Sequence, residues 1–169
     1  HRDLHSFPTR RSSDLKGSVF TAHQVPPEGG ETGWADMTAA YEALDPKMKE
    51  KIKDLCAYHS YSYSQAKYKH KPQEESEFSG YGFDVDPKPF RPLVKTHPET
   101  GKKSLLIGRH AFGIPGMEEA ESKAFLDELN DFACQGDRVY HHCWDPGDAV
   151  IWDNRNLRSE EHTSELQSQ

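Results

Sequence analysis

The stretch W-D-P-G-D-A-V-I-W-D-N-R, at residues 144–155, constrains the fold more than any other part of the chain. Its residues 145–148 predict a tight turn, because proline fixes φ, glycine accepts positive φ and aspartate side chains bond nearby backbone N–H groups. Residues 139–144 before the turn are rich in aromatic and β-branched side chains, and residues 149–152 after it form an apolar run. We therefore expect a β-hairpin whose second strand is well buried.

Helices are predicted between the strands. Asp36 and Asp45 stand where N-caps are expected, and Pro46 suits a first helical position. The first helix has apolar residues at spacings of three and four, and the second is expected to turn Met48, Ile52, Leu55 and Cys56 towards a core.

A third helix is predicted over residues 117–135, with acidic residues in its first turn and Gly136 as its stop. Its expected inner face carries Ala124, Phe125, Leu129 and Phe132. This helix leads the chain into the strand at residues 139–144.

Further strands are predicted at residues 17–25 and in a second hairpin formed by residues 92–96 and 104–107. His97, in the turn of that hairpin, matches no metal-binding spacing and is expected to be structural. The region at 67–92 has several prolines and mixed charges and is predicted to be a long loop. His59 and His70 are expected to be exposed loop residues.

The composition excludes several classes of function. The net charge is −7, without a cluster of basic residues interleaved with aromatics, so a nucleic-acid partner is not expected. No apolar run reaches the roughly eighteen residues of a membrane span, and no leader is visible, so we expect no membrane partner and a cytoplasmic protein. Cys56, Cys134 and Cys143 are odd in number and far apart, which predicts reduced, mostly buried thiols.

Three segments carry a family resemblance. Residues 26–37 are similar to the pattern P-x-x-G-G-x-T-x-x-A-x-M, residues 96–101 read T-H-P-E-T-G, and residues 144–155 are similar to W-x-P-G-D-x-x-x-W-D-N-R. These are motifs of the TauD/TfdA family of non-haem Fe(II), 2-oxoglutarate-dependent dioxygenases, and they occur here in the family order. The chain resembles this family over residues 16–157.

The resemblance implies a fold that is mainly β with inserted helices (α+β), an incomplete double-stranded β-helix or jelly roll. It implies an oxidoreductase that uses Fe(II), 2-oxoglutarate and O₂ to hydroxylate a small, anionic organic substrate, with release of succinate and CO₂. Residues 31–37 look closer to the aryloxyacetate branch of the family. Family members commonly associate, so a homo-oligomer is a further expectation.

The resemblance assigns few site residues. Thr32 matches the threonine that contacts the distal carboxylate of 2-oxoglutarate; the alternative is that Thr32 only bonds its local turn. The family's H-x-D/E metal motif falls at residues 5–7, where His5 is present but no carboxylate follows. The distal histidine falls near position 159, which holds Ser159. The metal triad is therefore expected to be missing, with His5 as the remaining candidate ligand.

The two ends match neither the family nor a periodic pattern. Residues 1–15 and 158–169 resemble translated sequencing-adapter sequence, so we expect non-native tails around a partial dioxygenase domain at residues 16–157. The alternative is that both are genuine disordered tails. Without the triad, the chain itself is expected to be inactive, and the rival to a dioxygenase is a catalytically inert, cupin-like fragment that only binds.

Overall fold

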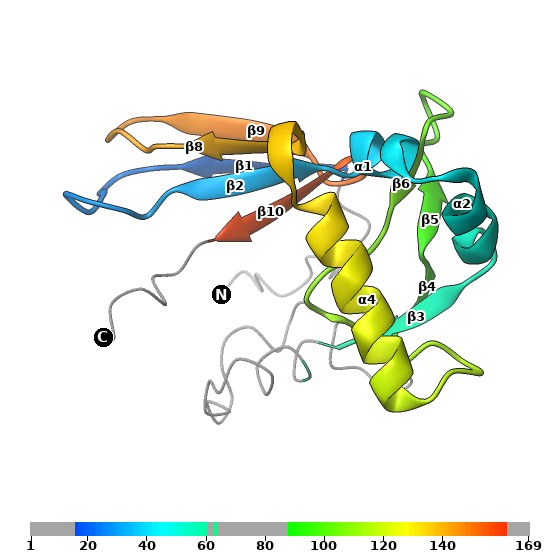
Figure 1. The fold of residues 1–169 in the computed structure, drawn as a ribbon. Helices are drawn as coiled ribbons and strands as arrows, with labels where there is room; N and C mark the ends of the chain where they lie inside the picture. The colour runs from blue at the N-terminus through cyan, green and yellow to red at the C-terminus, as the bar shows by residue number, and fades with distance from the viewer. Residues whose placement is uncertain (1–15, 61–62, 64–87, 162–169) are drawn as a thin grey trace, which may run out of the picture.

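The computed structural model describes residues 16–60, 63 and 88–161, which form a mainly β fold with inserted helices (Figure 1). The expected fold class is thus confirmed. In chain order the elements are β1 (Gly17–Thr21), β2 (Thr32–Asp36), α1 (Met37–Ala43), α2 (Pro46–Ile52), β3 (Cys56–His59), β4 (Phe90–Pro92), β5 (Val94–Thr96), β6 (Lys103–Leu105), β7 (Ala111–Phe112), α4 (Glu119–Ala133), the 3₁₀ helix Gly136–Arg138, β8 (Val139–His142), β9 (Ala149–Asp153) and β10 (Leu157–Glu161).

Five strands form two small antiparallel sheets at one end of the molecule (Figure 1). β1 pairs with β9, and β2 lies between β8 and β10. Trp34 of β2 contacts Trp152 of β9 with ring centroids 5.5 Å apart, so the two sheets pack face to face. We call these five strands and the turns between them the sandwich.

The prediction that residues 139–144 and 149–152 pair as a β-hairpin is wrong. The turn itself is present, with the Asp148 N–H donating to the Asp145 carbonyl at 3.0 Å. The strands on its two sides, β8 and β9, belong to different sheets. The turn bonds instead to the end of β1, where Gly147 N–H donates to Ala22 O at 2.7 Å and Ala22 N–H donates to Asp148 O at 2.9 Å. It carries the chain across the sandwich, as a connection between facing sheets must.

β9 is less buried than its apolar sequence indicates. Ile151 is 79% exposed, and its cross-strand partner Val19 is 62% exposed. Because side chains alternate along a strand, Trp152 points to the opposite face and packs inside the sandwich. The prediction of a well-buried strand is wrong because the described residues cover only one face of it.

β10 continues beyond residue 157, the expected end of the domain. It pairs with β2 from Leu157 opposite Asp36 to Glu161 opposite Thr32. The sequence pattern predicts no strand in residues 158–169, so that prediction is wrong for residues 158–161. Residues 1–15 and 162–169 lie outside the described residues, and their non-native origin stays a prediction.

The two short helices begin where the sequence indicates. The Asp36 side chain accepts two hydrogen bonds from backbone N–H groups in the first turn of α1, both at 2.9 Å. Asp45 does the same for α2, at 2.8 and 3.0 Å, and Pro46 is the first residue of that helix. Each cap satisfies backbone donors that have no partner within the helix.

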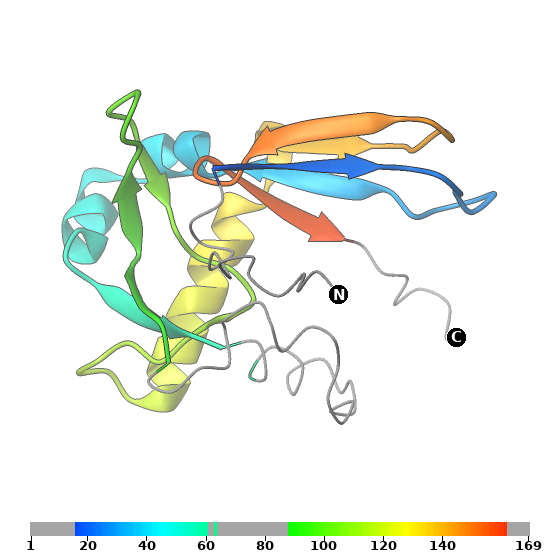
Figure 2. The ribbon, with the colours of Figure 1, turned by 180° about the vertical axis from the view of Figure 1, so that it is seen from behind.

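Helices α1 and α2 and the short strands β3 to β6 lie at the other end of the molecule from the tips of the sandwich strands (Figure 2). Buried side chains from α1, α2, α4 and the short strands, together with Ala35 of β2, form the hydrophobic core. Ile52 and Leu93 are fully buried, and Leu129 is 2% exposed. Within the described residues, no helix combines the length and apolarity needed to cross a bilayer. We call this group the helical core: Ala35, Met37, Ala40, Leu44, Ile52, Ala57, Leu93, Leu105, Ile107, Ala111, Ile114, Phe125, Leu126, Leu129 and Ala133.

α4 confirms the predicted helix but presents a slightly different face. Phe125 and Leu129 are buried as expected, whereas Ala124 is exposed and Leu126 is buried in its place. Ser122 is fully buried, and its hydroxyl accepts a hydrogen bond from the Ile114 N–H at 3.0 Å. This bond fixes the rotation of the helix about its axis.

The cysteines and α2 correct two smaller expectations. No disulfide joins the three cysteines, but Cys56 and Cys134 are only half-buried and Cys143 is exposed, so the prediction of mostly buried thiols is wrong. α2 ends at Ile52, so Cys56 lies on β3 and not on the helix.

His59, at the end of β3, is 6% exposed. Burial lowers the pKa of His59 to about 4, and the charges of Arg91 and His110 lower it further. The expectation of an exposed loop histidine is therefore wrong, because β3 continues through this residue and pairs with β4 and β7. Most of the loop expected at residues 67–92, with His70, lies outside the described residues.

Candidate functional site

Thr32 begins β2 directly after a tight glycine turn. Gly29 and Gly30 have φ values of +74° and +79°, which favour glycine. A Cβ atom on Gly30 would also lie 2.8 Å from the Pro26 Cγ, so a side chain does not fit there. Thr32 itself is 9% exposed. The turn thus places a nearly buried hydroxyl at the start of a sandwich strand.

The Thr32 hydroxyl is bonded to a distant residue. The Trp144 indole Nε1–H donates to Thr32 Oγ1 at 2.9 Å, across 112 positions of the sequence. Because Trp144 precedes the 145–148 turn, this bond joins the first and last of the three motifs. Thr32 is therefore tied to the sandwich, and not to its local turn alone.

Aromatic rings surround this bond. Trp34 is 4% exposed, and its ring centroid lies 6.0 Å from that of Trp144, 5.5 Å from that of Trp152 and 6.4 Å from that of Tyr140. The Trp34 Nε1–H has no hydrogen-bond acceptor in the described part of the chain. The rings of Trp34, Trp144 and Trp152 thus make the interior of the sandwich largely aromatic.

A second polar chain lies beside these rings. His142 Nε2 lies 2.9 Å from Asp148 Oδ2, and its Nδ1 lies 3.0 Å from the Tyr140 hydroxyl. A backbone hydrogen bond from Asp145 and the bond from His142 lower the pKa of Asp148, so this carboxylate is ionised and accepts the His142 Nε2–H. The Nδ1 atom then accepts a hydrogen bond from the Tyr140 hydroxyl. His142 is held between two partners and has no ring nitrogen left for a metal ion.

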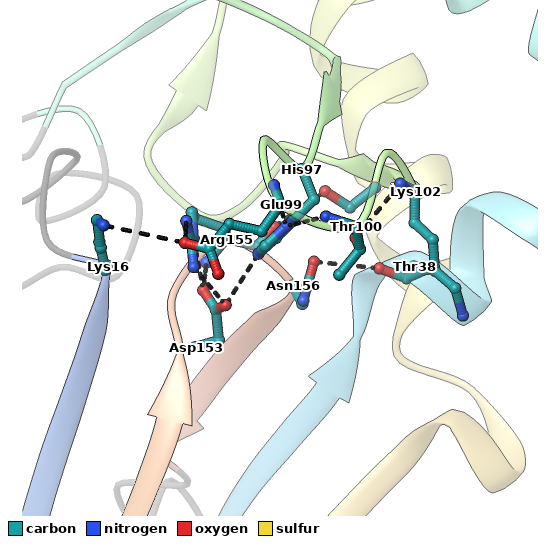
Figure 3. Close-up of polar contacts among 10 residues, drawn as sticks. Lys16, Thr38, His97, Glu99, Thr100, Lys102, Asp153, Arg155 and Asn156 are labelled. Carbon is teal, nitrogen blue, oxygen red and sulfur yellow. Dashed lines mark hydrogen bonds and ion pairs between the residues drawn. The ribbon is translucent and has the colours of Figure 1, made fainter.

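The T-H-P-E-T-G and W-D-N-R segments meet in a polar cluster (Figure 3). We call His97, Glu99, Asp153 and Arg155 the brace. His97 is 3% exposed, and its Nδ1 accepts hydrogen bonds from the backbone N–H groups of Glu99, at 3.2 Å, and Thr100, at 3.1 Å. Its Nε2–H is therefore the donor to Asp153 Oδ2, at 3.1 Å.

Arg155 completes the brace with two bonds to Asp153, from Nε to Oδ1 and from a terminal nitrogen to Oδ2, both at 3.0 Å. Its other terminal nitrogen lies 3.3 Å from Glu99. The Arg155 hydrogen bonds hold the pKa of Asp153 well below its usual range, and His97 adds to the effect. The brace fixes the turn between β9 and β10.

The described residues do not fit a metal centre by themselves. Across residues 16–60, 63 and 88–161, no three His, Cys, Asp or Glu residues form a group that could hold a metal ion. Position 159, where the resemblance puts the distal histidine, lies on β10 opposite Trp34 and next to the strand of Thr32. His5 is outside the described residues. The expected loss of the triad therefore stays a prediction.

Sequence reasoning missed both the role of Trp144 and the brace. Trp144 was predicted only as a strand residue, and His97 only as a structural residue in a turn. Trp144 and His97 each lie in one of the three motif segments, which is the sequence signal that could have pointed to their roles. The contacts span 112 and 56 positions, so no local pattern could pair them.

Comparison with known proteins identifies relatives. The family model "Taurine catabolism dioxygenase TauD, TfdA family" matches residues 5–157, a range that includes part of the expected N-terminal tail. An (S)-phenoxypropionate/alpha-ketoglutarate-dioxygenase of Sphingobium herbicidovorans is 56% identical over 154 residues, which cover 90% of this chain and 54% of the relative. An alpha-ketoglutarate-dependent 2,4-dichlorophenoxyacetate dioxygenase of Cupriavidus pinatubonensis is 36% identical over 151 residues, covering 89% and 51%. The chain spans about half the length of these relatives.

A solved structure gives the same result for the fold. The crystal structure of AAD-2 in complex with Mn(II) and N-oxalylglycine matches with a TM-score of 0.74 and 38% identity, over 85% of this chain and 55% of that one. The fold shared with such neighbours is the jelly roll, which confirms the expected architecture. With a family match over most of its length and relatives at 56% and 36% identity, the chain belongs to the TauD/TfdA family of 2-oxoglutarate-dependent dioxygenases.

Proposed function

We propose that this chain is part of an enzyme that hydroxylates a small anionic organic compound at the expense of 2-oxoglutarate and O₂, releasing succinate and CO₂. The single observation that carries the proposal is the Thr32 hydroxyl, which is 9% exposed and faces an aromatic interior. Its oxygen already accepts the Trp144 N–H, so its own proton is available to a carboxylate. We assign Thr32 to the distal carboxylate of 2-oxoglutarate.

The proposed substrate class is an aryloxyalkanoate. The relatives at 56% and 36% identity are named for phenoxypropionate and 2,4-dichlorophenoxyacetate, which are both aryloxy carboxylates. An anionic substrate of this kind needs an apolar surface for its ring and a donor for its carboxylate. The aromatic sandwich interior supplies the apolar surface.

We propose Fe(II) as the metal of the whole enzyme, by family membership; the AAD-2 neighbour holds Mn(II). The described residues do not supply a site for this metal by themselves. A homo-oligomer, a cytoplasmic location and the lack of nucleic-acid and membrane partners stay predictions.

A second candidate, a binding-only fragment, has one observation in its favour. The part of the chain that the structure describes holds no group of three potential metal ligands. Under this alternative the 169-residue chain would retain Thr32 and its surroundings but would not turn over.

A titration tests the cosubstrate assignment. The purified, ¹⁵N-labelled chain is titrated with 2-oxoglutarate and followed by NMR, with Thr32→Val, Thr32→Ser and the exposed control Thr21→Val as variants. Loss of a hydrogen bond to a charged group should weaken binding by roughly 10-fold or more in Thr32→Val. Thr32→Ser, which keeps the hydroxyl, and Thr21→Val should bind like the wild type. Equal affinity of Thr32→Val and wild type would refute the assignment.

Two further measurements separate the dioxygenase from the binding-only fragment. Anaerobic addition of Fe(II) and 2-oxoglutarate to the chain should give no metal-to-ligand charge-transfer band if the triad is missing; a stoichiometric band would show an intact metal site. The full-length protein should form succinate in step with consumption of (S)-2-phenoxypropionate. Full-length protein that forms no succinate with any aryloxyalkanoate would contradict the proposed substrate class.

A further inference from the structure

We propose that Trp144 is a positioning residue for the cosubstrate: its indole N–H occupies the acceptor side of the Thr32 hydroxyl and leaves the O–H to donate to the distal carboxylate of 2-oxoglutarate. The inference rests on the proposed function, because it assumes that Thr32 binds this carboxylate. It adds a residue outside the metal and cosubstrate ligands, one that acts only through Thr32.

The chemistry of the two groups gives the bond its direction. A threonine hydroxyl has one donor and two acceptor positions, whereas an indole N–H can only donate. The 2.9 Å contact between Trp144 Nε1 and Thr32 Oγ1 therefore uses a lone pair of the hydroxyl. The Thr32 proton has to point elsewhere, and no acceptor for it is found among the described residues. A carboxylate, which only accepts, is the complementary ligand.

The indole is held on several sides. Its ring centroid lies 4.5 Å from that of His142, at an interplanar angle of 82°, and 5.1 Å from that of Phe20. His142 is itself fixed by Asp148 and Tyr140. The turn that follows Trp144 is bonded to Ala22 at the end of β1. Trp144 thus has little freedom to turn its N–H away from Thr32.

Holding the hydroxyl in this way favours binding for two reasons. Threonine is stiff at χ1, so the remaining freedom is the rotation of the O–H, which the indole bond restricts. A hydroxyl that already accepts a hydrogen bond is also polarised and becomes a better donor. Both effects lower the ordering cost of capturing a carboxylate.

The first experiment reads the bond without changing Trp144. In ¹⁵N-labelled chain, the indole N–H resonance of Trp144 should move upfield and exchange faster with solvent in Thr32→Val, and should stay in place in Thr32→Ser. The indole resonance of Trp152, which also packs on Trp34, is the internal control. A Trp144 resonance that Thr32→Val does not move overturns the proposal.

The second experiment measures 2-oxoglutarate affinity in a double-mutant cycle of Trp144→Phe and Thr32→Val. Trp144→Phe keeps an aromatic ring but removes the N–H, and it should weaken binding by roughly 3- to 10-fold. In the Thr32→Val background it should have no further effect, because Trp144 acts through the hydroxyl. Tyr58→Phe, which removes a polar hydrogen from an aromatic side chain on β3 outside the sandwich, is the matched control and should weaken binding by less than about 2-fold.

The outcomes are distinct. If the losses of affinity from the two changes multiply in the double variant, or if Trp144→Phe and Tyr58→Phe weaken binding equally, the positioning role is overturned and the proposed function stands. If the resonances of the wild-type chain do not respond to 2-oxoglutarate, the assignment of Thr32 to the cosubstrate carboxylate is overturned, and the role of Trp144 with it; the succinate assay of the full-length protein tests the proposed function separately. Circular dichroism and amide dispersion of each variant are compared with those of the wild type before titration. A loss of affinity caused by misfolding is thereby recognised.

Discussion

The sandwich and the helical core use different side chains and are buried to different degrees. The helical core is mostly aliphatic, and members such as Ile52 and Leu129 are exposed by 2% or less. The sandwich interior is built from aromatic rings around Thr32, while its outer face leaves Ile151 79% exposed. The helical core can stabilise the fold through burial alone. The sandwich instead positions polar atoms such as the Thr32 hydroxyl, as our proposal for the cosubstrate site requires.

The brace connects the turn between β9 and β10 to the hairpin of β5 and β6. His97 comes from the hairpin side and Asp153 from the end of β9. The same turn contacts α1, because the Met37 N–H donates to the Asn156 carbonyl at 2.9 Å. A change in the brace should therefore affect both regions, unlike a change within either one.

The largest expected effect separates the two regions directly. Leu129→Ala, in the helical core, should lower the free energy of unfolding by about 2–5 kcal/mol, because it leaves a cavity among buried side chains. Ile151→Ala, on the outer face of β9, should change it by less than about 0.5 kcal/mol. Urea denaturation of the two variants measures the difference. Similar losses would mean that Ile151 is covered in solution, contrary to its exposure in the structure.

The next largest effect is a dependence of the free energy of unfolding on pH, caused by His59 at the end of β3. Burial lowers the pKa of His59 to about 4 in the folded state, below the ordinary histidine value of 6.5, so the unfolded state takes up a proton first as the pH falls. The free energy of unfolding should be unaffected above pH 6.5 and should fall between pH 6.5 and 4, by at most about 3 kcal/mol.

His59→Gln should flatten that slope, and His23→Gln, a change at an exposed histidine, should keep it. Urea titrations at half-unit pH steps measure the slope for each variant. A wild-type slope that survives in His59→Gln would assign the pH dependence to another group.

A smaller effect is expected from the brace. Asp153→Ala leaves the buried His97 Nε2–H without its acceptor, which should cost about 1–3 kcal/mol. Glu99→Ala removes an exposed partner of Arg155 and Lys16 and should cost less than about 1 kcal/mol. Amide hydrogen exchange of the two variants should show faster exchange in both the sandwich and the hairpin for Asp153→Ala. Faster exchange confined to one region would contradict the connecting role of the brace.

The smallest effect tests a helix cap beside the helical core. Asp45→Ala removes both side-chain bonds to the first turn of α2 and should lower the free energy of unfolding by about 1 kcal/mol. Asp54→Ala, at an exposed aspartate beyond the end of the helix, should leave it unchanged within about 0.5 kcal/mol. Thermal denaturation of both variants measures whether Asp45→Ala lowers the melting temperature more than Asp54→Ala does. Equal melting temperatures would mean that the cap adds nothing to stability.

Local chemistry was readable from the sequence. Asp36 and Asp45 cap helices because their side chains reach N–H groups two and three residues away. Contacts over so short a separation can be predicted from residue type and position. The turn at residues 145–148 and the hairpin at 94–105 follow from the same short-range rules. Thr32 was predicted as a site residue in a different way, through the resemblance of residues 26–37 to a family motif.

Pairing over long distances was decided only by the tertiary structure. Whether β8 pairs with β9 or with β2 depends on the opposing sheet, which the turn sequence does not specify. Strand β9 looks buried in sequence because its residues are apolar, yet only the face towards Trp34 is covered. The Trp144–Thr32 and His97–Asp153 bonds join residues brought together by folding, so the sequence supplied the donors and acceptors and the packing of the sheets determined which of them meet.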